Sequence, residues 1–454
     1  MKYIADDTIV ALSTTTGGAI AIVRMSGPKA IGIVSTCFSK TLDNAKPNTA
    51  LHGDIIDEEG QTVDNVVVTL WKTPHSYTGE DIAEVACHGS SYIAHQIINL
   101  FIRYGARPAE PGEFTKRAYL NGKMDLSQAE AVADLIAATN KATHHIAISQ
   151  LRGQFSSQLS QLREKLLKLT SLLELELDFA DHEELEFADR KELLTIAEEI
   201  DKHIQTLAHS FETGQAIKKG IPVAIIGKTN VGKSTLLNKL LKDERAIVSD
   251  IHGTTRDTIE DTIDINGITF RFIDTAGIRQ ATDKIEQIGI ERTYQAIEKA
   301  KIILWVADKI PTDKEKEEMK QRCQGRKLIN VINKIDLGNT ENITKSATDT
   351  TSIGISAKQN INIDKLETII YKSADIPELT ENDVVVTSAR HYEALTNAHT
   401  HLQRVLIGLQ QQLSGDLIAE DLRLTLDTLA EITGGQITPQ ETLNNIFHHF
   451  CVGK

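Results

Sequence analysis

Residues 227–234 read Gly227-Lys228-Thr229-Asn230-Val231-Gly232-Lys233-Ser234, which fits the pattern G-x-x-x-x-G-K-S. An apolar run at 223–226 predicts a strand before this loop, and residues 235–241 predict a helix after it. In that context the glycines let backbone N–H groups turn inward around a phosphate, and the helix directs its positive end to the same place. We expect Lys233 to neutralise the β- and γ-phosphates of a nucleotide and the Ser234 hydroxyl to bind Mg²⁺. The alternative, a glycine turn without a ligand, leaves Lys233 unexplained.

Strands alternate with helical stretches from about residue 220 to about residue 377, with candidate strands at 223–226, 269–273, 302–307, 328–332 and 352–355. This alternation predicts βαβ units around a largely parallel sheet. An open α/β sheet binds its ligand at the carboxyl ends of its strands. Polar motifs follow three of the candidate strands, and they read Asp274-Thr275-Ala276-Gly277, Asn333-Lys334-Ile335-Asp336 and Ser356-Ala357-Lys358.

The motif Asn333-x-x-Asp336 selects the base. A carboxylate at Asp336 can accept hydrogen bonds from N1–H and the 2-amino group of guanine, whereas adenine has neither donor there. The wrong base would leave a charge unpaired, so such a site discriminates strongly. The ordered set of motifs therefore predicts GTP as the nucleotide and argues against a P-loop ATPase or kinase.

The first switch loop is expected between the phosphate loop and Asp274, in Ser249-Asp250-Ile251-His252-Gly253-Thr254-Thr255-Arg256-Asp257. A threonine here can bind Mg²⁺ only when the γ-phosphate is present, and both Thr254 and Thr255 are candidates. Small signalling GTPases orient the attacking water with a glutamine directly after the glycine that Gly277 represents here. This chain has Ile278 at that position, so another group must act. The nearby candidates, each of which could equally be a solvated helix charge, are Arg279, Asp283, Lys284 and Glu286.

The composition is typical of a globular protein: of the 454 residues, 41% are hydrophobic and 25% are charged. The net charge of −14 argues against an extensive basic surface that binds nucleic acid, although not against a local one. The four cysteines are widely separated, which excludes a disulfide framework and a cysteine-rich zinc site. No secretion signal opens the chain, and no apolar run approaches the roughly 18 residues that span a bilayer. We expect a cytoplasmic protein.

The flanking regions have different patterns. Residues 8–114 mix short strands (19–24, 66–71 and 82–86) with a helix at 90–104, which predicts an α+β domain. From about 126 to 211 and again from about 389 the pattern is helical. In the first stretch we expect a seam of core residues within a bundle, formed by Leu159, Leu162, Leu166, Leu169 and Leu173. In the second stretch a similar seam recurs at helical spacing, at Leu395, Leu402, Val405, Leu406, Leu409 and Leu413. The predicted architecture is an α+β N-terminal domain and a helical bundle with an inserted α/β P-loop GTPase domain.

Several segments outside the nucleotide motifs resemble the bacterial MnmE/TrmE family of tRNA-modification GTPases, and the resemblance covers nearly the whole chain. The segments are 18–27 (GAIAIVRMSG), 78–81 (TGED), 110–118 (EPGEFTKRA), 120–126 (LNGKMDL) and 450–454 (FCVGK). The phosphate loop departs slightly from the family pattern, with Gly-Lys-Thr-Asn for Gly-Arg-Pro-Asn, but it keeps Asn230.

The resemblance implies four segments: a tetrahydrofolate-binding, dimerising domain at 1–118, the first helical half at 119–217, the G domain at 218–378 and the second helical half at 379–454. It further implies that a homodimer works with a flavin-dependent MnmG/GidA-type partner, in a heterotetramer or larger assembly, on C5 of the wobble uridine of certain tRNAs. FAD and NADH would enter only through that partner. A 5-formyl or 5,10-methylene tetrahydrofolate would carry the one-carbon unit, and residue matching assigns its site to Arg24, Glu84, Lys123 and Lys454.

The resemblance also implies that two G domains dimerise around a potassium ion. Matched by position, the K⁺ ligands are Asn230, Ser249, Ile251 and Thr254, which leaves Thr255 to bind Mg²⁺ with Ser234. The catalytic matches are Glu286, which would orient water, and Cys451, whose chemical role is a hypothesis. The full predicted GTP-binding set is Asn230, Val231, Gly232, Lys233, Ser234, Thr235, Ser249, Asp250, Ile251, His252, Gly253, Thr254, Thr255, Asp274, Thr275, Ala276, Gly277, Asn333, Lys334, Asp336, Ser356, Ala357 and Lys358.

A different class of function shares every nucleotide motif: a GTP-switched ribosome or RNA assembly factor without modification chemistry of its own. Tetrahydrofolate binding by the N-terminal region would distinguish the enzyme from this switch. The candidate tRNA contacts, which could also be ordinary surface charges, are Arg103, Arg107, Lys116 and Arg117. Because neighbouring residues of a strand face opposite sides, we interpret Cys87 and His88 as structural.

Overall fold

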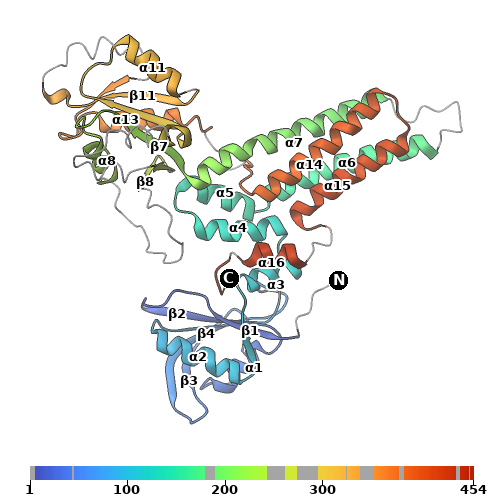
Figure 1. Ribbon diagram of the computed structural model, residues 1–454. Coiled ribbons are helices and arrows are strands. Elements are labelled where there is room, and N and C mark those ends of the chain that lie inside the picture. Colours follow the sequence, from blue (N-terminus) through green and yellow to red (C-terminus); the bar gives the residue numbers. More distant parts are fainter. Residues whose placement is uncertain are drawn as a thin grey trace. The chain divides into compact units, whose positions relative to one another are not determined.

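The computed structural model describes residues 6–42, 45–178, 190–242, 261–273, 295–323, 325–337, 352–377, 383–435, 440–448 and 450–453. Two compact units divide the chain (Figure 1). The first comprises Met1–Ala137, Ala147–Gln205 and Glu393–Lys454, and the second comprises Ala138–Ile146 and Thr206–Tyr392.

The first unit contains a mostly antiparallel sheet with the strand order β3-β4-β5-β2-β1-β6. Among the described strands of this sheet, only β1 and β6 pair in parallel. The strands are β1 (Thr8–Leu12), β2 (Ile20–Ser26), β3 (Ala50–Ile56), β4 (Thr62–Trp71), β5 (Ile82–His88) and β6 (Ala106–Pro108). Helices α1 (Ala30–Cys37) and α2 (Ser91–Arg103) cover one face of the sheet. Because side chains alternate along a strand, Val23 and Met25 point into this core, and Arg24 points to the opposite face.

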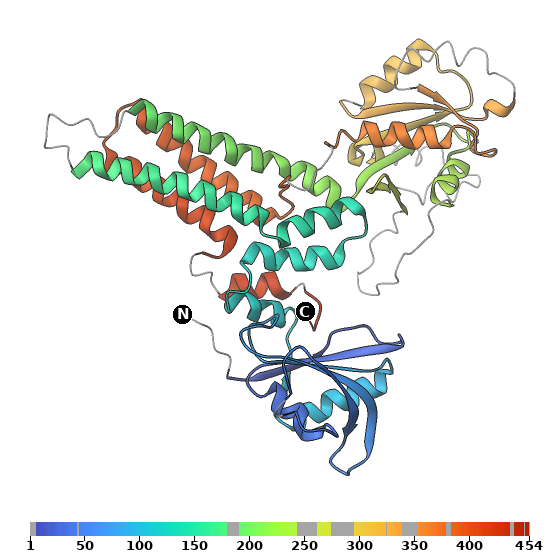
Figure 2. The same ribbon diagram turned by 180° about the vertical axis from the view of Figure 1, so that it is seen from behind.

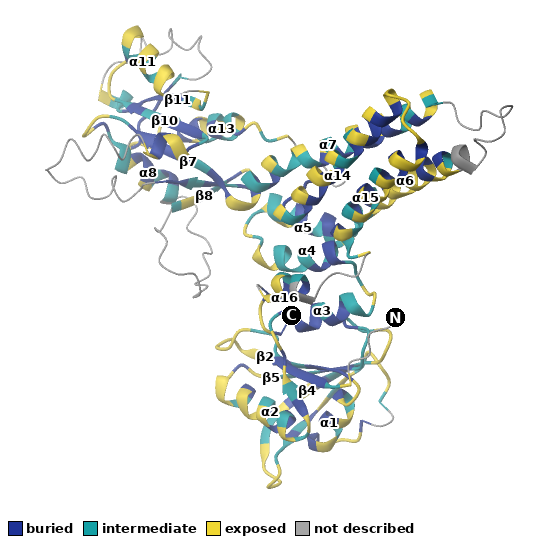
Figure 3. Ribbon diagram, turned by 45° about the vertical axis from the view of Figure 1, so that its right-hand side comes forward, coloured by how far each residue is buried: buried dark blue, intermediate teal, exposed yellow. Residues whose placement is uncertain are grey.

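Long helices form a bundle in the same unit. Within it, α6 (Gln154–Asp178), the part of α7 (Arg190–Lys219) up to Gln205, α14 (Ala389–Gln410) and α15 (Gly415–Thr433) lie side by side in both views (Figure 2). The five leucines of the predicted α6 seam are all buried, as are the α14 seam residues from Leu395 to Leu409. Figure 3 shows these buried inner sides in dark blue. The prediction was wrong for Leu413, which lies beyond the end of α14 and is 40% exposed.

Shorter helices complete the helical part. They are α3 (Glu113–Leu120), α4 (Leu126–Ala137), α5 (Lys141–Leu151) and α16 (Gln440–His448). Phe447 and Phe450 pack with Leu126 and Ala129, so the end of the chain is joined to the start of α4.

The second unit contains the inserted α/β fold. Its sheet has the order β12-β11-β10-β7-β9-β8 and is parallel except for the β8–β9 pair. The strands are β7 (Ile221–Ile226), β8 (Asp261–Ile265), β9 (Ile268–Phe272), β10 (Ile302–Ala307), β11 (Lys327–Ile332) and β12 (Ser352–Gly354). The helices and the short 3-10 turn are α8 (Lys233–Lys242), α11 (Asp313–Cys323), α13 (Ile363–Ser373) and η1 (Ile335–Leu337).

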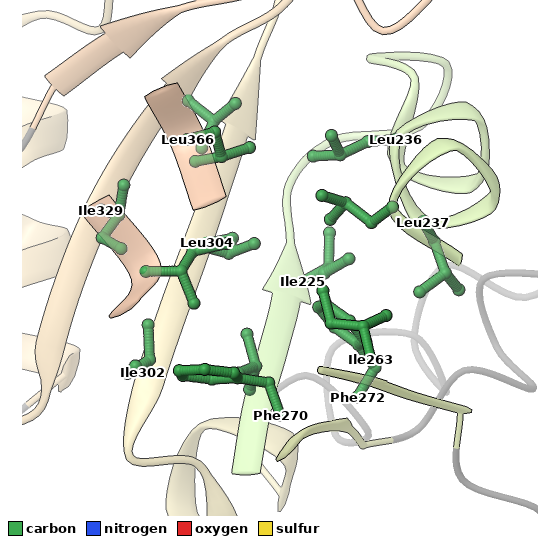
Figure 4. Close-up of a cluster of buried hydrophobic side chains, with 14 of the residues drawn as sticks. Ile225, Leu236, Leu237, Ile263, Phe270, Phe272, Ile302, Leu304, Ile329 and Leu366 are labelled. Atoms are coloured by element: carbon green, nitrogen blue, oxygen red, sulfur yellow. The ribbon is translucent and has the colours of Figure 1, made fainter. Parts of the chain in front are cut away.

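The core of this unit lies between the sheet and its helices. Leu236 and Leu237 of α8 and Leu366 of α13 face strand residues such as Leu304 and Phe270 (Figure 4). The predicted fold class is confirmed: an α+β N-terminal domain, a helical bundle, and an inserted α/β domain with a largely parallel sheet. Among the described residues, no helix combines the length and the apolar character needed to span a membrane.

Candidate nucleotide site and N-terminal pocket

The carboxyl ends of four parallel strands meet at one edge of the second unit's sheet. Register pairs Ile226 of β7 with Trp305 of β10, then Ala307 with Ile332 of β11, and Ile332 with Gly354 of β12. The phosphate loop, the Asn333 motif and the Ser356 motif each follow one of these ends. The structure therefore brings together three motifs that are far apart in the sequence.

The phosphate loop needs glycine at two positions for steric reasons. Gly227 has φ +147°, and a Cβ there would collide with the Val306 carbonyl oxygen of β10. Gly232 has φ +98°, and a Cβ there would collide with the Asn333 amide. At both glycines the neighbouring atoms, one in the backbone of β10 and one in the Asn333 side chain, lie too close to leave space for a Cβ.

Lys233 is the first residue of α8, and its side chain folds back onto the loop. Its Nζ donates to the carbonyl oxygens of Gly227 at 2.6 Å and Lys228 at 2.7 Å. Burial lowers the pKa of its ammonium group. Ser234 and Thr235 follow in the first helical turn, where the helix dipole favours an anion. The loop thus combines a fixed cation with a helix N-terminus at the place where phosphates are predicted to bind.

Asn333 and Lys334 join the base motif to the phosphate loop. The Asn333 side chain is buried; its Nδ2 donates to the Val231 carbonyl at 2.9 Å, and its Oδ1 accepts from the Ala357 amide at 3.0 Å. Nζ of Lys334 donates to the Asn230 carbonyl at 2.7 Å. Both Asn230 (φ +60°) and Lys334 (φ +65°) have left-handed backbones. These bonds connect all three motifs, with Asp336 half-buried in η1 and Ser356 buried two residues after the end of β12.

Other predicted site residues fall outside the described part of the chain. They are Ser249, Asp250, Ile251, His252, Gly253, Thr254, Thr255, Asp274, Thr275, Ala276, Gly277, Glu286 and Lys454. Lys358, by contrast, is described and is exposed next to Ala357.

A pocket of about 390 Å³ lies on the face of the N-terminal sheet opposite α1 and α2. Arg24 of β2 is directly opposite Glu84 of β5, and its Nε donates to Oε1 of Glu84 at 2.7 Å. The guanidinium carbon lies 5.8 Å from the ring centre of Tyr77 and 5.7 Å from that of Phe114, within cation–π range. The pocket is lined by Arg24, Trp71, Tyr77, Ile82, Glu84, Val132 and Leu151.

Gly453, near the end of the chain, contacts Arg24 of this pocket. The Gly453 carbonyl accepts a hydrogen bond from Nη1 of Arg24 at 3.3 Å and another from Oγ of Ser13 at 3.2 Å. Gly453 is buried, has φ +95°, and a Cβ there would collide with the Leu12 carbonyl of β1. Gly453 is therefore held against the end of β1.

The four cysteines differ in accessibility. Cys451 is exposed, and its carbonyl accepts from the Gly112 amide at 3.4 Å. Burial raises the pKa of the Cys37 thiol to about 12 and, with the nearby Asp64 carboxylate, that of Cys87 to about 11. Among the four, Cys451 is thus the one whose thiol meets solvent.

Comparison with known proteins decides the family. The model described as "MnmE helical domain" matches residues 126–451, and the one described as "GTP-binding protein TrmE N-terminus" matches residues 8–123. A "tRNA modification GTPase MnmE" from Phocaeicola vulgatus is 51% identical over 500 residues and covers 100% of both chains. Proteins of the same name from Bacteroides thetaiotaomicron (51%; 99% of both chains) and Flavobacterium johnsoniae (47%; 99% of this chain, 100% of the other) are also similar. The chain belongs to the MnmE family of tRNA modification GTPases.

Membership in the MnmE family confirms the predicted enzyme class, a GTPase that acts in tRNA modification. Among solved structures, Era in complex with MgGDPNP and nucleotides 1506–1542 of 16S ribosomal RNA is 30% identical, with a TM-score of 0.26. It covers 40% of this chain and 66% of its own.

The family segment 110–118 and residues 78–81 form a buried ionic network. Arg117 is 1% exposed, and its guanidinium donates to the carboxylates of Asp7, Glu80 and Glu113 at 2.8–3.3 Å. Arg107 also binds Asp7 and Glu113. The interpretation of Arg117 as a tRNA contact is therefore wrong, because a buried guanidinium surrounded by carboxylates cannot meet a phosphate.

Some functional candidates were missed from the sequence, and one predicted residue lies apart from the pocket. Tyr77 and Phe114 flank Arg24 although neither was assigned a role; Phe114 belongs to the quoted segment 110–118, which was the available signal. Lys123 is not among the pocket-lining residues within the described chain, and its Nζ donates to the Pro74 carbonyl at 2.8 Å. Its role in folate binding stays a prediction.

Proposed function

We propose that the chain hydrolyses GTP at the strand edge and uses that hydrolysis to drive modification of the wobble uridine at C5. A flavin-dependent partner of the MnmG/GidA type would act with it, and the added group would be aminomethyl or carboxymethylaminomethyl. The observation that carries this proposal is the bonding of Asn333 and Lys334 to the phosphate loop. These bonds support a site in which the motif that recognises the base is directly connected to the loop that binds the phosphates.

In the nucleotide site, each residue has a defined task. Lys233 would balance the charge of the β- and γ-phosphates, and the N–H groups at the start of α8 would orient them. Asp336 would accept the two guanine N–H donors. Hydroxyl oxygens at Ser234 and Thr255 are ligands of the hard kind that Mg²⁺ prefers.

Potassium is proposed to activate hydrolysis when two G domains meet. Because Ile278 replaces the glutamine of signalling GTPases, the chain needs another source of positive charge at the phosphates. K⁺ supplies that charge when it is bound. Asn230 is exposed on the loop and held by Lys334, which supports it as a neutral oxygen ligand alongside Ser249, Ile251 and Thr254. Glu286 would orient the attacking water.

The N-terminal pocket fits a folate. Its volume is within the usual range for small-molecule sites, and it combines aromatic walls at Trp71 and Tyr77 with a carboxylate and a guanidinium. Glu84 can accept from N–H donors of a pterin ring, and Arg24 can donate to a ligand oxygen. Tetrahydrofolate carries the one-carbon unit when it is bound, with Lys123 and Lys454 as further candidate contacts. The pocket favours an enzyme over a pure assembly factor, which has no use for such a cavity.

The remaining parts of the proposal follow the family. The protein would be a cytoplasmic homodimer that meets tRNA together with the partner, and the domains would be 1–118, 119–217, 218–378 and 379–454. Cys451 would act in the modification chemistry, a role that its exposure permits.

Equilibrium binding of 5-formyl-tetrahydrofolate to the full chain tests the proposed pocket. Arg24→Ala should weaken binding about 10-fold or more, since charged hydrogen bonds contribute about 1.5–3 kcal/mol each. Arg103→Ala, which removes an exposed guanidinium from α2, is the matched control and should bind like the wild type. No measurable folate binding by the wild type would overturn the proposed chemistry and favour the assembly factor.

A further inference from the structure

The start of α5 is bonded to the β8–β9 hairpin of the G domain. The Ala142 amide donates to the Gly267 carbonyl at 3.0 Å, and Nδ2 of Asn140 donates to Oγ1 of Thr269 at 2.7 Å. All four residues lie in the second unit, although residues 138–146 were predicted in the helical domain.

The turn of the hairpin is shaped to fit against α5. Asn266 (φ +53°) and Gly267 (φ +82°) both have left-handed backbones, as a tight Asn-Gly hairpin turn requires. A Cβ at Gly267 would lie 2.8 Å from Cβ of Lys141. The hairpin therefore meets the helix without space for a side chain at this position.

Asn140 serves two elements at once. Its Oδ1 accepts from the Thr143 amide at 2.8 Å and caps the first turn of α5. Its Nδ2 is the donor to Thr269. The amide is thereby held at both ends, and its orientation is linked to the position of β9.

Thr269 also contacts the connection from α7 to β7. Gly220 (φ +78°) directly follows the end of α7. A Cβ at this glycine would lie 3.3 Å from Cγ2 of Thr269. Ile146 of α5, Ile217 of α7 and Val385 form one buried cluster in the same unit. Thr269 is thus next to both helices that flank the G domain in the sequence.

The hairpin lies in the chain between two segments that are predicted to contact the nucleotide. β8 and β9 connect the predicted switch segment around 249–255 to the motif at 274–277, both of which are expected to respond to the γ-phosphate. At its other end α5 finishes at Leu151, a lining residue of the Arg24 pocket. The same helix therefore contacts the hairpin at its first turn and contributes its last residue to the lining of the pocket.

We propose that the Asn140–Thr269 contact couples the GTPase cycle to the modification pocket by transmitting movement of the β8–β9 hairpin to α5. Asn140 and Thr269 are positioning residues, since neither lies at the nucleotide. The inference rests on the proposed function, in which GTP hydrolysis drives modification.

Thr269→Val tests the contact, because it removes Oγ1 but keeps the β-branched shape and leaves the α5 cap intact. In cells whose chromosomal copy is deleted, the modified fraction of wobble uridine should form about 10-fold more slowly, the size of a typical coupling between sites. GTP hydrolysis by the purified full chain should stay within about twofold of the wild type, and the thermal midpoint should be unchanged. Thr269→Ser, which retains the hydroxyl, should restore modification.

A double-mutant cycle with Asn140→Ala separates coupling from a packing defect. If the contact acts as a unit, the double variant should be no worse than the more impaired single variant. Additive losses, or equal losses of hydrolysis and modification, would overturn the inference. Wild-type modification by Thr269→Val would do so as well, provided that Lys233→Ala abolishes modification. Normal modification by Lys233→Ala would instead overturn the proposed function itself.

Discussion

In the largely parallel sheet of the G domain, the candidate site lies at the carboxyl ends of the strands, whereas in the N-terminal sheet the pocket lies on the face opposite α1 and α2. The first site is formed mainly by backbone, at Gly227, Gly232 and the start of α8. The Asn333 side chain holds this loop by a hydrogen bond to the Val231 carbonyl. The second is built from side chains, with Arg24 held by Glu84 and by the chain terminus. A backbone site requires a contiguous motif, but a side-chain site can be assembled from distant segments.

The largest effect is expected at the backbone site. Lys233→Ala removes the ammonium held inside the loop, and hydrolysis at saturating GTP should fall about 100-fold or more, as for other fixed groups that stabilise developing charge. Lys228→Ala is the matched control, because that side chain is 86% exposed and pairs with Glu315 on α11. Folate binding should be unchanged in both variants. Loss of folate binding in Lys233→Ala would break the distinction between the two sites.

A somewhat smaller effect should follow from changing the base contact. Asp336→Asn replaces one of the two carboxylate acceptors with an NH2 donor, which matches the 2-oxo group of xanthine, so affinity for GTP should fall about 100-fold while affinity for xanthosine triphosphate rises. Competition binding with both nucleotides measures the change. Asp313→Asn, a fully exposed carboxylate at the start of α11, is the control. Retention of the guanine preference by Asp336→Asn would remove Asp336 from its assigned role.

The chain terminus offers a sharper test of the side-chain site. Gly453→Ala places a Cβ against Leu12 in a left-handed backbone, a strain of about 1–3 kcal/mol, and should undock the tail. Arg24 then loses an acceptor, and folate binding should weaken about 10-fold while GTP hydrolysis stays at the wild-type rate. Val452→Ala, at a position that is 53% exposed, should have no effect. Equal folate affinity in Gly453→Ala and the wild type would show that the tail does not organise the pocket.

The smallest effect near neutral pH concerns the ionic network below the pocket. Burial works to raise the pKa of Glu113, but hydrogen bonds from Arg107, the Glu110 amide and Arg117 outweigh it, and the folded pKa lies below the ordinary 4.5. A lowered folded pKa gives stability that is fully present above the unfolded pKa and is lost as pH falls through the folded one. The wild-type thermal midpoint should therefore decline below about pH 4.5.

Comparison of two variants isolates this network. Glu113→Gln should already be destabilised at pH 7 and should show a flatter decline in acid, whereas Glu58→Gln, which alters an exposed carboxyl, should follow the wild type. Parallel curves for Glu113→Gln and the wild type would contradict the assignment.

The contrast between the two sheets explains what the sequence could predict. The phosphate loop and Asn333 were recognised because each motif is contiguous and directly follows an apolar strand, and β10 has its predicted bounds. The docking of Gly453 on Arg24 joins residues 429 positions apart, and no local pattern signals it. Arg117 was interpreted as a candidate surface contact because the local sequence does not show that its guanidinium is buried. In the fold, the carboxylates of Asp7 and Glu80, from distant segments, join that of Glu113 around it.

The central claim is that nucleotide consumed by this chain's own G domain drives tRNA modification, and a nucleotide-swapped chain tests it most directly. The reaction is reconstituted with Asp336→Asn, the flavin-dependent partner, folate and tRNA, and the wobble uridine is analysed by mass spectrometry with either GTP or xanthosine triphosphate. The account predicts modification with xanthosine triphosphate and little with GTP, the reverse of the wild type. Equal modification with both nucleotides, or with none, would contradict it.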